Sequence, residues 1–430
     1  MPKVYLAVHG CSSNLADYEI AAGLLTQAGF ELVDNSEKSD LNVIFTCIVK
    51  FRTFNRMLHM IKQMTNLKKP LIVAGCMTKT ERRLIEKLNP DASLVAPDSV
   101  EKIVEAAGSA LEGKKVVFLE DQNKPKLNLP RRRINPVIGI VPIARGCLQK
   151  CSYCHEPYRG KLFSYPLKEI VSEVKRAVAE GCKEIWLTSL DNGCYGLDGG
   201  TNLAELLNAV CGVEGKFFVR VGMINPLHAK NMLKELIEAY RNPKIFKFIH
   251  LPLQAGSDKI LRLMERGYQV KDFVEIVEEF REKLPELTLA TDVITGFPEE
   301  SDSDFKRTLE LIRRIKPEVT NVSKFGARPW VKASGYEQLP GDVIKERSKE
   351  LFNLCKTIWL EKNKKWIGWE GECLIDEKGR KENTWIGRNF AYKPIVVHST
   401  ENLLGKFLKV KVVGAAHTYL LGTVIQEFDG

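Results

Sequence analysis

Three cysteines on one short stretch are the residues best suited to chemistry in this chain. Cys147, Cys151 and Cys154 form a C-x3-C-x2-C array directly after the apolar run Val137–Ala144. This run predicts a strand, so the cysteines lie at its carboxyl end, where α/β folds place their reactive groups. Three thiolates can hold three irons of a four-iron cluster, which normally takes four protein ligands. The remaining iron would then be open to a small molecule.

Two other chemistries fit the same stretch. The three cysteines together with His155 could form a Cys3His zinc site. Cys151-Ser-Tyr-Cys154-His155 also has the C-x-x-C-H spacing of haem attachment, a reaction that needs an oxidising compartment. Ligand type and spacing favour the cluster, and zinc and haem are the alternatives.

A second set of three cysteines is dispersed over residues 1–120. This region alternates strand and helix patterns and predicts an open parallel α/β domain. Cys11, Cys47 and Cys76 each follow the end of a predicted strand. Neighbouring parallel strands open on one crevice, so we expect a second three-thiolate site; three unrelated buried cysteines are the alternative. The predicted strands and helices are Val4–Val8, Asp17–Gln27, Leu41–Thr46, Thr53–Asn66 and Pro70–Ala74.

Residues 121–136 form a basic, proline-punctuated linker, and residues 137–366 predict a partial (β/α)6 barrel. Polar residues that follow its strands, Asp191, Asn225 and Gln254, would line the same mouth as the cysteine loop, beside Tyr153. The predicted strands are Val137–Ala144, Glu184–Thr188, Phe217–Val221, Phe246–Leu251, Leu287–Ile294 and Val319–Phe325. The helices between them include Pro166–Glu180, Ala229–Tyr240, Val270–Lys283 and Ser301–Ile315.

After a helix predicted over 341–365, residues 367–430 contain five short strand patterns and predict a small all-β barrel. Four basic residues lie there among aromatic ones, a combination that suits RNA; a barrel core with solvated lysines is the alternative. The basic residues are Arg388, Lys393, Lys409 and Lys411. The strands are Trp369–Ile375, Thr384–Gly387, Tyr392–His398, Phe407–Val413 and Tyr419–Ile425.

Composition agrees with a cytoplasmic protein that binds an anionic partner. The 430 residues carry a formal charge of +10, which favours nucleic acid. No apolar run reaches membrane-spanning length, and the first residues do not resemble a signal peptide. Eleven cysteines in such a chain favour metal ligation over disulfides. Five of them have no predicted role beyond packing: Cys182, Cys194, Cys211, Cys355 and Cys373.

The chain resembles the radical S-adenosylmethionine methylthiotransferases nearly from end to end. Within them it is most similar to the archaeal and eukaryotic branch that acts on N6-threonylcarbamoyladenosine in tRNA. The resemblance implies a flavodoxin-like N-terminal domain, a radical S-adenosylmethionine barrel and a TRAM-type RNA-binding barrel. The matching motifs include His9-Gly-Cys-Ser-Ser-Asn14, Thr46-Cys47, Ala74-Gly-Cys76, Arg145-Gly-Cys147, Asn225-Pro226, His250-Leu-Pro-Leu-Gln-Ala-Gly-Ser257 and Thr291-Asp-Val-Ile-Thr-Gly-Phe-Pro298.

The resemblance implies two [4Fe–4S] clusters. Cys147, Cys151 and Cys154 would hold the one that binds S-adenosylmethionine, with Tyr153, Asp191, Asn225 and Gln254 as cofactor contacts. A 5′-deoxyadenosyl radical would abstract hydrogen from C2 of the adenine. The set Cys11, Cys47 and Cys76 would hold an auxiliary cluster that carries the transferred sulfur.

The implied partners are the anticodon stem-loop of tRNA, an electron donor such as ferredoxin or flavodoxin, and a sulfur donor. The target would be position 37 of the anticodon loop. Two rival functions are methylthiolation of another substrate, such as a ribosomal protein, and non-catalytic RNA binding with structural clusters or zinc. Four features depart from the family pattern: Phe45, a shorter segment at His155–Gly160, Leu190, and Trp330-Val331-Lys332 within Arg328–Ala333.

Overall fold

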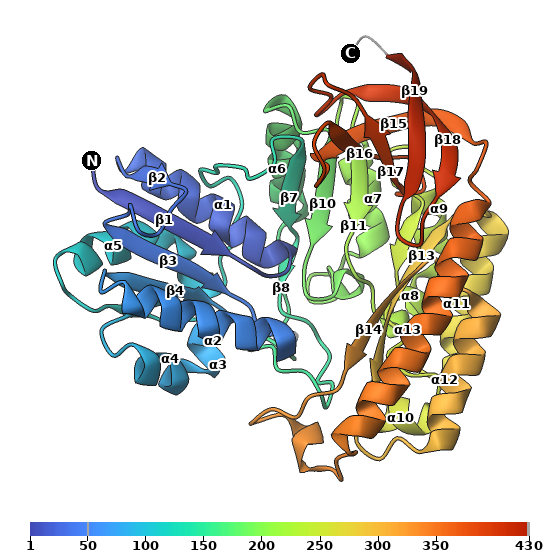
Figure 1. Cartoon of the computed structure of the whole chain (residues 1–430), viewed down its shortest axis with the longest axis horizontal. Helices are drawn as coiled ribbons and strands as arrows, with labels where there is room; N and C mark the ends of the chain where they lie inside the picture. The colour runs from blue at the N-terminus through green and yellow to red at the C-terminus, as the bar shows by residue number, and fades with distance from the viewer. Residues whose placement is uncertain (50, 428–430) are drawn as a thin grey trace.

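The computed structural model describes residues 1–49 and 51–427, which form three parts (Figure 1). An N-terminal α/β domain lies beside a central half-barrel of parallel strands, and a small β-barrel caps one end of the central part. The fold class expected from the sequence is confirmed. No helix in the described part of the chain combines the length and the apolar character needed to cross a membrane.

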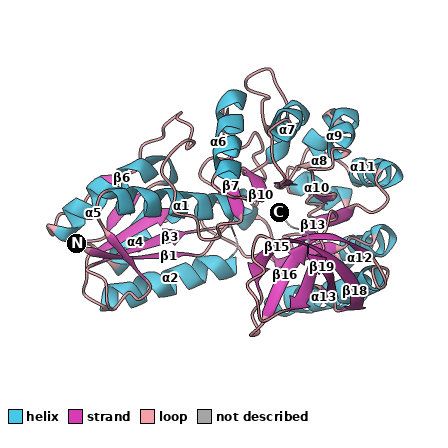
Figure 2. Cartoon of the chain, turned by 90° about the horizontal axis from the view of Figure 1, so that it is seen from above, coloured by secondary structure: helices cyan, strands magenta, loops and turns pink. Residues whose placement is uncertain are grey.

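The N-terminal sheet has six parallel strands in the order β2-β1-β3-β4-β5-β6. Helices α1 and α5 cover one face, and α2 and α4 cover the other (Figure 2). This double cover explains why every residue of β3 and β4 is buried, and why both strands are apolar runs. The strands are β1 (Lys3–Val8), β2 (Glu31–Val33), β3 (Leu41–Thr46), β4 (Leu71–Gly75), β5 (Ser93–Val95) and β6 (Val117–Phe118). The helices are α1 (Ser12–Gln27), α2 (Phe51–Asn66), α3 (Met77–Thr80), α4 (Arg82–Leu88) and α5 (Ile103–Leu111).

This strand order places a topological switch point between β1 and β3. On one side of that point the chain continues to β2, and on the other side it continues to β4. Sheets of this kind bind ligands at the carboxyl ends of the strands beside the switch point. The three shortest strands of this sheet, β2, β5 and β6, were not predicted from the sequence. A strand of two or three residues is too short to show a periodic pattern.

The central part contains two three-stranded parallel sheets, β7-β10-β11 and β12-β13-β14. An isolated parallel bridge between Val219 and Ile245 joins them, so six strands curve as one half-barrel with helices outside (Figure 2). The strands are β7 (Ile138–Pro142), β10 (Glu184–Thr188), β11 (Phe218–Val221), β12 (Phe248–His250), β13 (Thr288–Thr295) and β14 (Val319–Lys324). The helices are α6 (Leu167–Ala179), α7 (Leu203–Cys211), α8 (Pro226–Asn231), α9 (Leu233–Tyr240), α10 (Asp258–Leu263), α11 (Val270–Lys283) and α12 (Asp302–Ile315).

One predicted helix of the central part was wrong. The segment Ala229–Tyr240 is divided between α8 and α9, and the chain leaves helical geometry at Met232, where φ is −127°. Asn225 caps α8 through its side chain, and Pro226 occupies the first helical position. These two residues start a short helix at the strand end, where the site is built.

A closed barrel of five strands, in the order β15-β16-β17-β19-β18, completes the chain. Helix α13 (Gly341–Lys364) leads into it along β14 (Figure 1). Cys373, Ile375, Ile395 and Leu408 fill its interior. Its strands are β15 (Glu370–Lys378), β16 (Thr384–Arg388), β17 (Pro394–His398), β18 (Phe407–Ala415) and β19 (Leu420–Glu427).

Candidate active site

The contiguous cysteine set lies on the loop that follows β8 (Ala144–Arg145), at the carboxyl end of the half-barrel. Cys147 and Cys151 are buried, and Cys154 is half-buried. Burial raises the pKa of Cys147 to about 11 and that of Cys154 to about 12. Metal ligation must therefore displace protons from these thiols, which couples cluster binding to pH.

A buried arginine contacts this loop from the end of α10. Arg266 is 4% exposed, and its Nη1 lies 3.2 Å from Cys151 Sγ and 3.2 Å from the Tyr153 hydroxyl. A guanidinium N–H directed at a cysteine sulfur stabilises negative charge there, whether on a thiolate or on a cluster. Arg266 could not be identified from the sequence, because a lone arginine after a helix has no distinctive local pattern.

Backbone contacts hold the cysteine loop against two other segments. Ser152 donates from its hydroxyl to the Leu263 carbonyl at 2.7 Å and from its N–H to the Met264 carbonyl at 3.1 Å. Ala333 N–H donates to the Ser152 carbonyl at 2.9 Å. The loop is therefore positioned by α10 and by the segment after β14, and not by its own sequence alone.

The dispersed cysteines come together at the switch point of the N-terminal sheet. Cys11, Cys47 and Cys76 follow β1, β3 and β4 directly. The Cys11 thiol hydrogen-bonds with Cys47, which raises the pKa of Cys11 and lowers that of Cys47. Burial raises the pKa of Cys76, and the charges of Glu156 and Cys11 raise it further. Cys11 also precedes the first turn of α1, where a helix N-terminus favours a thiolate.

Small residues and one threonine allow these three strand ends to approach. A Cβ on Gly10 would lie 2.9 Å from Cys47 Cβ, and one on Gly75 would lie 2.4 Å from the Thr46 carbonyl oxygen. Gly75 also has φ of +90°, which other residues rarely adopt. The Thr46 carbonyl accepts from Asn14 Nδ2 at 2.9 Å and from Cys76 N–H at 3.1 Å. One peptide thus links the loops of all three cysteines.

A cavity of about 440 Å³ lies between the N-terminal domain and the loop of the contiguous cysteines. Cys154 and Glu156 line it from the central part, and Lys79 and Thr80 line it from the N-terminal domain. Glu156 Oε2 lies 3.9 Å from Cys76 Sγ, so the segment after Cys154 reaches the second set directly. Burial raises the pKa of Glu156 to about 8.

Two further side chains complete the walls of this cavity. Trp330 lines it and is 78% exposed. His155 Nε2 lies 2.8 Å from Glu81 Oε1, so its ring joins the two domains. This contact uses Nε2 only, so the zinc alternative is disfavoured by the absence, among the described residues, of a group of His, Cys, Asp or Glu spaced to hold a metal ion.

The donor sets fit iron–sulfur clusters. Each has three thiols on loops at strand ends, and Glu156 links the two sets through its contact with Cys76. Among the residues that the structure describes, no three His, Cys, Asp or Glu side chains have the spacing that holds a single metal ion. A four-iron cluster occupies the space between its ligands, because each thiolate binds a different iron.

Three family models match successive parts of the chain. The radical SAM superfamily matches residues 141–312, and the TRAM domain matches residues 365–425. A family described only as the uncharacterized protein family UPF0004 matches residues 3–97, which contain the dispersed cysteines.

Curated relatives match over the whole length. The "probable threonylcarbamoyladenosine tRNA methylthiotransferase" of Pyrococcus abyssi is 43% identical, over 99% of this chain and 100% of the relative. The human threonylcarbamoyladenosine tRNA methylthiotransferase is 32% identical, over 99% of this chain and 74% of its own length. The chain belongs to the threonylcarbamoyladenosine tRNA methylthiotransferase family. It therefore uses S-adenosylmethionine and two [4Fe–4S] clusters, as the sequence predicted.

Solved structures share the fold of this methylthiotransferase at low sequence identity. The radical S-adenosylmethionine methyltransferase TsrM from Kitasatospora setae has a TM-score of 0.58 at 14% identity, covering 78% of this chain and 75% of TsrM. The cobalamin-dependent radical enzyme OxsB has a TM-score of 0.55 at 12% identity, covering 83% of this chain and 56% of OxsB.

The predicted cofactor contacts of the methylthiotransferase lie at the same mouth as the cysteine loop. Asp191 is 3% exposed, and its Oδ1 accepts from Gly193 N–H and Asn225 N–H, each at 3.0 Å. Gln254 is 8% exposed, has φ of +67°, and its Oε1 has no hydrogen-bond partner among the described residues. His228 was missed; its Nε2 lies 3.6 Å from Asp191 Oδ2. Tyr153 is held by Arg266, and its contact with S-adenosylmethionine stays a prediction.

The four basic residues of the barrel divide into two pairs. Lys409 and Lys411 lie on β18, where Lys411 is exposed and pairs with Glu370 at 2.8 Å. The prediction that all four would be available to RNA was wrong for Lys393, which is only 3% exposed. It was also wrong for Arg388, which is largely buried and pairs with Asp376 at 2.9 Å. Both side chains turn toward the half-barrel because barrel and half-barrel pack together there.

The unassigned cysteines and the unusual Phe45 occupy cores. Cys182, Cys194, Cys211, Cys355 and Cys373 are all buried, which agrees with the packing role expected of them. Phe45 is 1% exposed and packs edge-on against Tyr18, with ring centroids 5.9 Å apart. This substitution therefore changes the core beneath the dispersed cysteines and leaves the cavity walls unchanged.

Proposed function

We propose that this protein inserts a methylthio group at C2 of N6-threonylcarbamoyladenosine at position 37, in the anticodon loop of tRNA. The family membership supports the reaction, and the observation that carries it in this chain is the contact between the two thiol sites. Glu156, two residues after Cys154, has its Oε2 3.9 Å from Cys76 Sγ, and Cys154 and Glu156 both line a cavity of about 440 Å³. An adenine base at this junction would meet both sites, as a transfer of sulfur to an activated carbon requires.

The clusters and S-adenosylmethionine supply the radical chemistry that breaks an unactivated aryl C–H bond, which acid–base side chains cannot do. The side chains of the protein orient and enclose the reactants. Arg266 holds Cys151 and Tyr153 together, and Asp191 fixes the backbone at Gly193 and Asn225. Cys47, Cys147 and Cys151 are buried, which shields part of each set from water, whereas Cys11 is exposed.

The outer face of the barrel supports RNA binding. Lys409 and Lys411 on β18 lie beside strand β19 and the exposed Tyr419, which is 40% exposed. Lysine side chains bind phosphates, and an exposed aromatic ring stacks on bases. The formal charge of +10 adds long-range attraction for an anionic polymer. We infer that an electron donor such as ferredoxin or flavodoxin, and a separate sulfur donor, dock elsewhere during turnover.

The decisive experiment measures iron and sulfide after anaerobic reconstitution of the wild type and two triple-alanine variants. One variant lacks Cys147, Cys151 and Cys154, and the other lacks Cys11, Cys47 and Cys76. We expect about eight irons in the wild type and about four in each variant. About four irons in the wild type, lost with only one triple, would contradict the two-site function.

Activity is then assayed on tRNA that carries threonylcarbamoyladenosine, with nucleoside mass spectrometry as the readout. Wild type should form the methylthio nucleoside, and both triple variants should not. Two clusters with no product on tRNA, but methylthiolation of a ribosomal protein, would favour the rival substrate. Two clusters with no product on either substrate would favour the non-catalytic alternative.

A further inference from the structure

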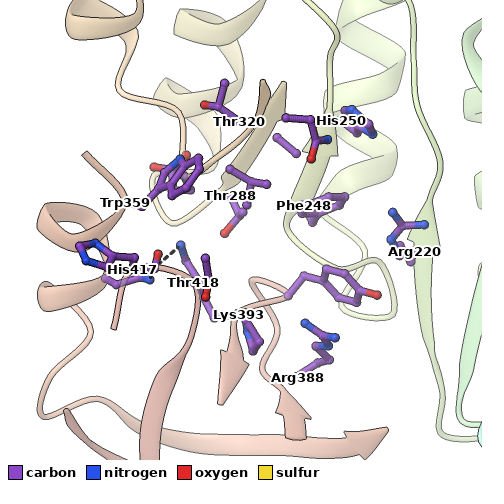
Figure 3. A pocket seen from close by; sticks show the side chains of 17 residues that line it. Arg220, Phe248, His250, Thr288, Thr320, Trp359, Arg388, Lys393, His417 and Thr418 are labelled. Atoms are coloured by element: carbon purple, nitrogen blue, oxygen red, sulfur yellow. Dashed lines mark hydrogen bonds between the residues drawn. The ribbon is translucent and has the colours of Figure 1, made fainter. Parts of the chain in front are cut away.

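A second cavity, of about 420 Å³, lies between the half-barrel and the small barrel (Figure 3). Phe248, Thr288 and Val319 line it, and they begin strands β12, β13 and β14. Lys393 enters it from the small barrel. The cavity is thus at the amino ends of the strands, whereas the cysteines are at the carboxyl ends. None of the six cysteines of the two thiol sites lines it.

Several buried polar atoms that line this cavity have no hydrogen-bond partner among the described residues. They are Thr288 Oγ1, Trp359 Nε1 and Arg220 Nε. Thr288 is 2% exposed and Trp359 7%. Buried polar atoms are nearly always paired, because leaving them unpaired costs free energy. The indole and guanidinium nitrogens can only donate, so the missing partner must accept hydrogen bonds.

Positively charged side chains around the cavity outnumber the negatively charged ones. Glu318 is already neutralised by Arg281 and by Lys362, whose Nζ lies 2.7 Å away. Lys393 Nζ donates to Asn363 Oδ1 at 3.2 Å and has no carboxylate within ion-pair distance in the described part of the chain. Burial lowers the pKa of Lys393 to about 8, and the charge of Glu318 partly opposes this shift. Because Glu318 is already paired with Arg281 and Lys362, an anion in the cavity would compensate the remaining positive charge.

Arg220 is the second cation of the cavity without an ion pair among the described residues. Its guanidinium lies 5.1 Å from the ring centroid of Trp186, 5.5 Å from that of Phe248 and 5.6 Å from that of Tyr392. The rings hold the guanidinium in place and leave its Nε unpaired. Arg388, by contrast, is neutralised by Asp376 at 2.9 Å.

We propose that this cavity binds a small phosphate-bearing anion of mononucleotide size. Arg220 and Lys393 would face the phosphate, and Phe248 and Trp359 would contact the organic part. The volume lies within the range of small-molecule sites. A free ligand fits better than an RNA backbone phosphate, because Thr288 and Trp359, which carry the unpaired donors, are 2% and 7% exposed and out of reach of a polymer.

Isothermal titration calorimetry on the full-length, cluster-loaded protein tests this proposal. The probe is cytidine monophosphate, chosen because it lacks the adenosine that the S-adenosylmethionine site would take. Cytidine, without the phosphate, serves as the ligand control. We expect cytidine monophosphate to bind and cytidine not to bind. Inorganic phosphate should bind more weakly than cytidine monophosphate; equal binding would overturn the assignment to a mononucleotide.

Two variants locate the bound probe. Lys393→Met and Arg220→Met should each weaken binding by at least about tenfold, because each removes one charged hydrogen-bond donor. The matched control is Lys411→Met, since Lys411 is exposed on the same barrel and pairs with Glu370, outside the cavity. It should leave binding unchanged. The melting temperature of Lys393→Met should not fall, since the substitution removes a buried charge without a partner carboxylate.

Three results would overturn the proposal. One is the absence of binding by the wild type, and another is binding that neither variant weakens. The third is displacement of cytidine monophosphate by an anticodon stem-loop RNA, which would make the cavity part of the RNA site. Arg220→Met and Lys393→Met should lose cytidine monophosphate binding and keep tRNA methylthiolation. Measuring both therefore distinguishes a failure of this proposal from a failure of the proposed function.

Discussion

The two cysteine sets are assembled in different ways. Cys147, Cys151 and Cys154 lie within eight residues, and their loop is recognisable from spacing alone. Cys11, Cys47 and Cys76 are brought together by the order of β1, β3 and β4 in a parallel sheet. Both sites need close backbone approach, at Gly146 in the first and at Gly75 in the second, but only the second depends on the spacing of separate strands. This difference predicts which substitutions disable each site.

The largest expected effect is at Gly75. A Cβ there would lie 2.4 Å from the Thr46 carbonyl oxygen, at φ of +90°. Gly75→Ala should force the ends of β3 and β4 apart and remove about four of about eight irons after reconstitution. The matched control is Gly29→Ala, because Gly29 has φ of +86° and no atom within 4 Å of an added Cβ. It should cost about 1–2 kcal/mol of stability and no iron. Equal iron loss in Gly75→Ala and Gly29→Ala would contradict the view that the dispersed site depends on the close approach of β3 and β4.

The next effect concerns the contiguous site alone. Arg266→Met removes the N–H donor 3.2 Å from Cys151 Sγ. Activity should fall by about 10–100-fold. The midpoint potential of that cluster should become more negative, because less charge stabilises its reduced form. Potentiometric titration followed by EPR measures both clusters separately. Arg262→Met, at an exposed position on α10, is the control, and a shift in the auxiliary cluster would contradict the assignment.

Substitutions of Trp330 test the cavity that Cys154 and Glu156 also line. Its φ of +70° is unfavourable for a bulky residue, and its side chain is 78% exposed in the cavity wall. Trp330→Asn should raise the free energy of unfolding by about 1 kcal/mol, since asparagine adopts this conformation more readily. We expect a base of the tRNA to stack on the indole ring. Loss of that ring in Trp330→Asn should weaken tRNA binding by at least about fivefold. Trp330→Phe should keep both the ring and the strain. Unchanged affinity in Trp330→Asn would exclude stacking.

The smallest effect is within the dispersed site. The Thr46 hydroxyl donates to the Ala74 carbonyl at 2.6 Å, next to Cys47 and Cys76. Thr46→Val should lower the free energy of unfolding by about 1 kcal/mol, as measured by urea denaturation. Iron should be lost first from the auxiliary site during dilution into chelator. Faster loss from the contiguous site would reverse the proposed order of robustness.

Most of the secondary structure follows from local pattern. The apolar runs of β3, β10 and β13 predict strands because both of their faces are covered. The short strands β2 and β5 and the helix break at Met232 could not be predicted from the sequence, because their geometry depends on neighbouring elements. Arg266 and His228 were missed for the same reason: each acts through a partner distant in sequence.

The amino-acid sequence by itself determined the two thiol sets, the order of three domains and the family, since these rest on residue types, spacing and motifs. Only the tertiary structure decided which side chains face which space. Lys393 and Lys411 lie in the same barrel and look equivalent in sequence, yet one is 3% exposed and the other is exposed on the surface. Burial depends on the packing of the barrel against the half-barrel, which is a contact between segments far apart in the chain. The same packing directs Arg220 and Lys393 into one cavity.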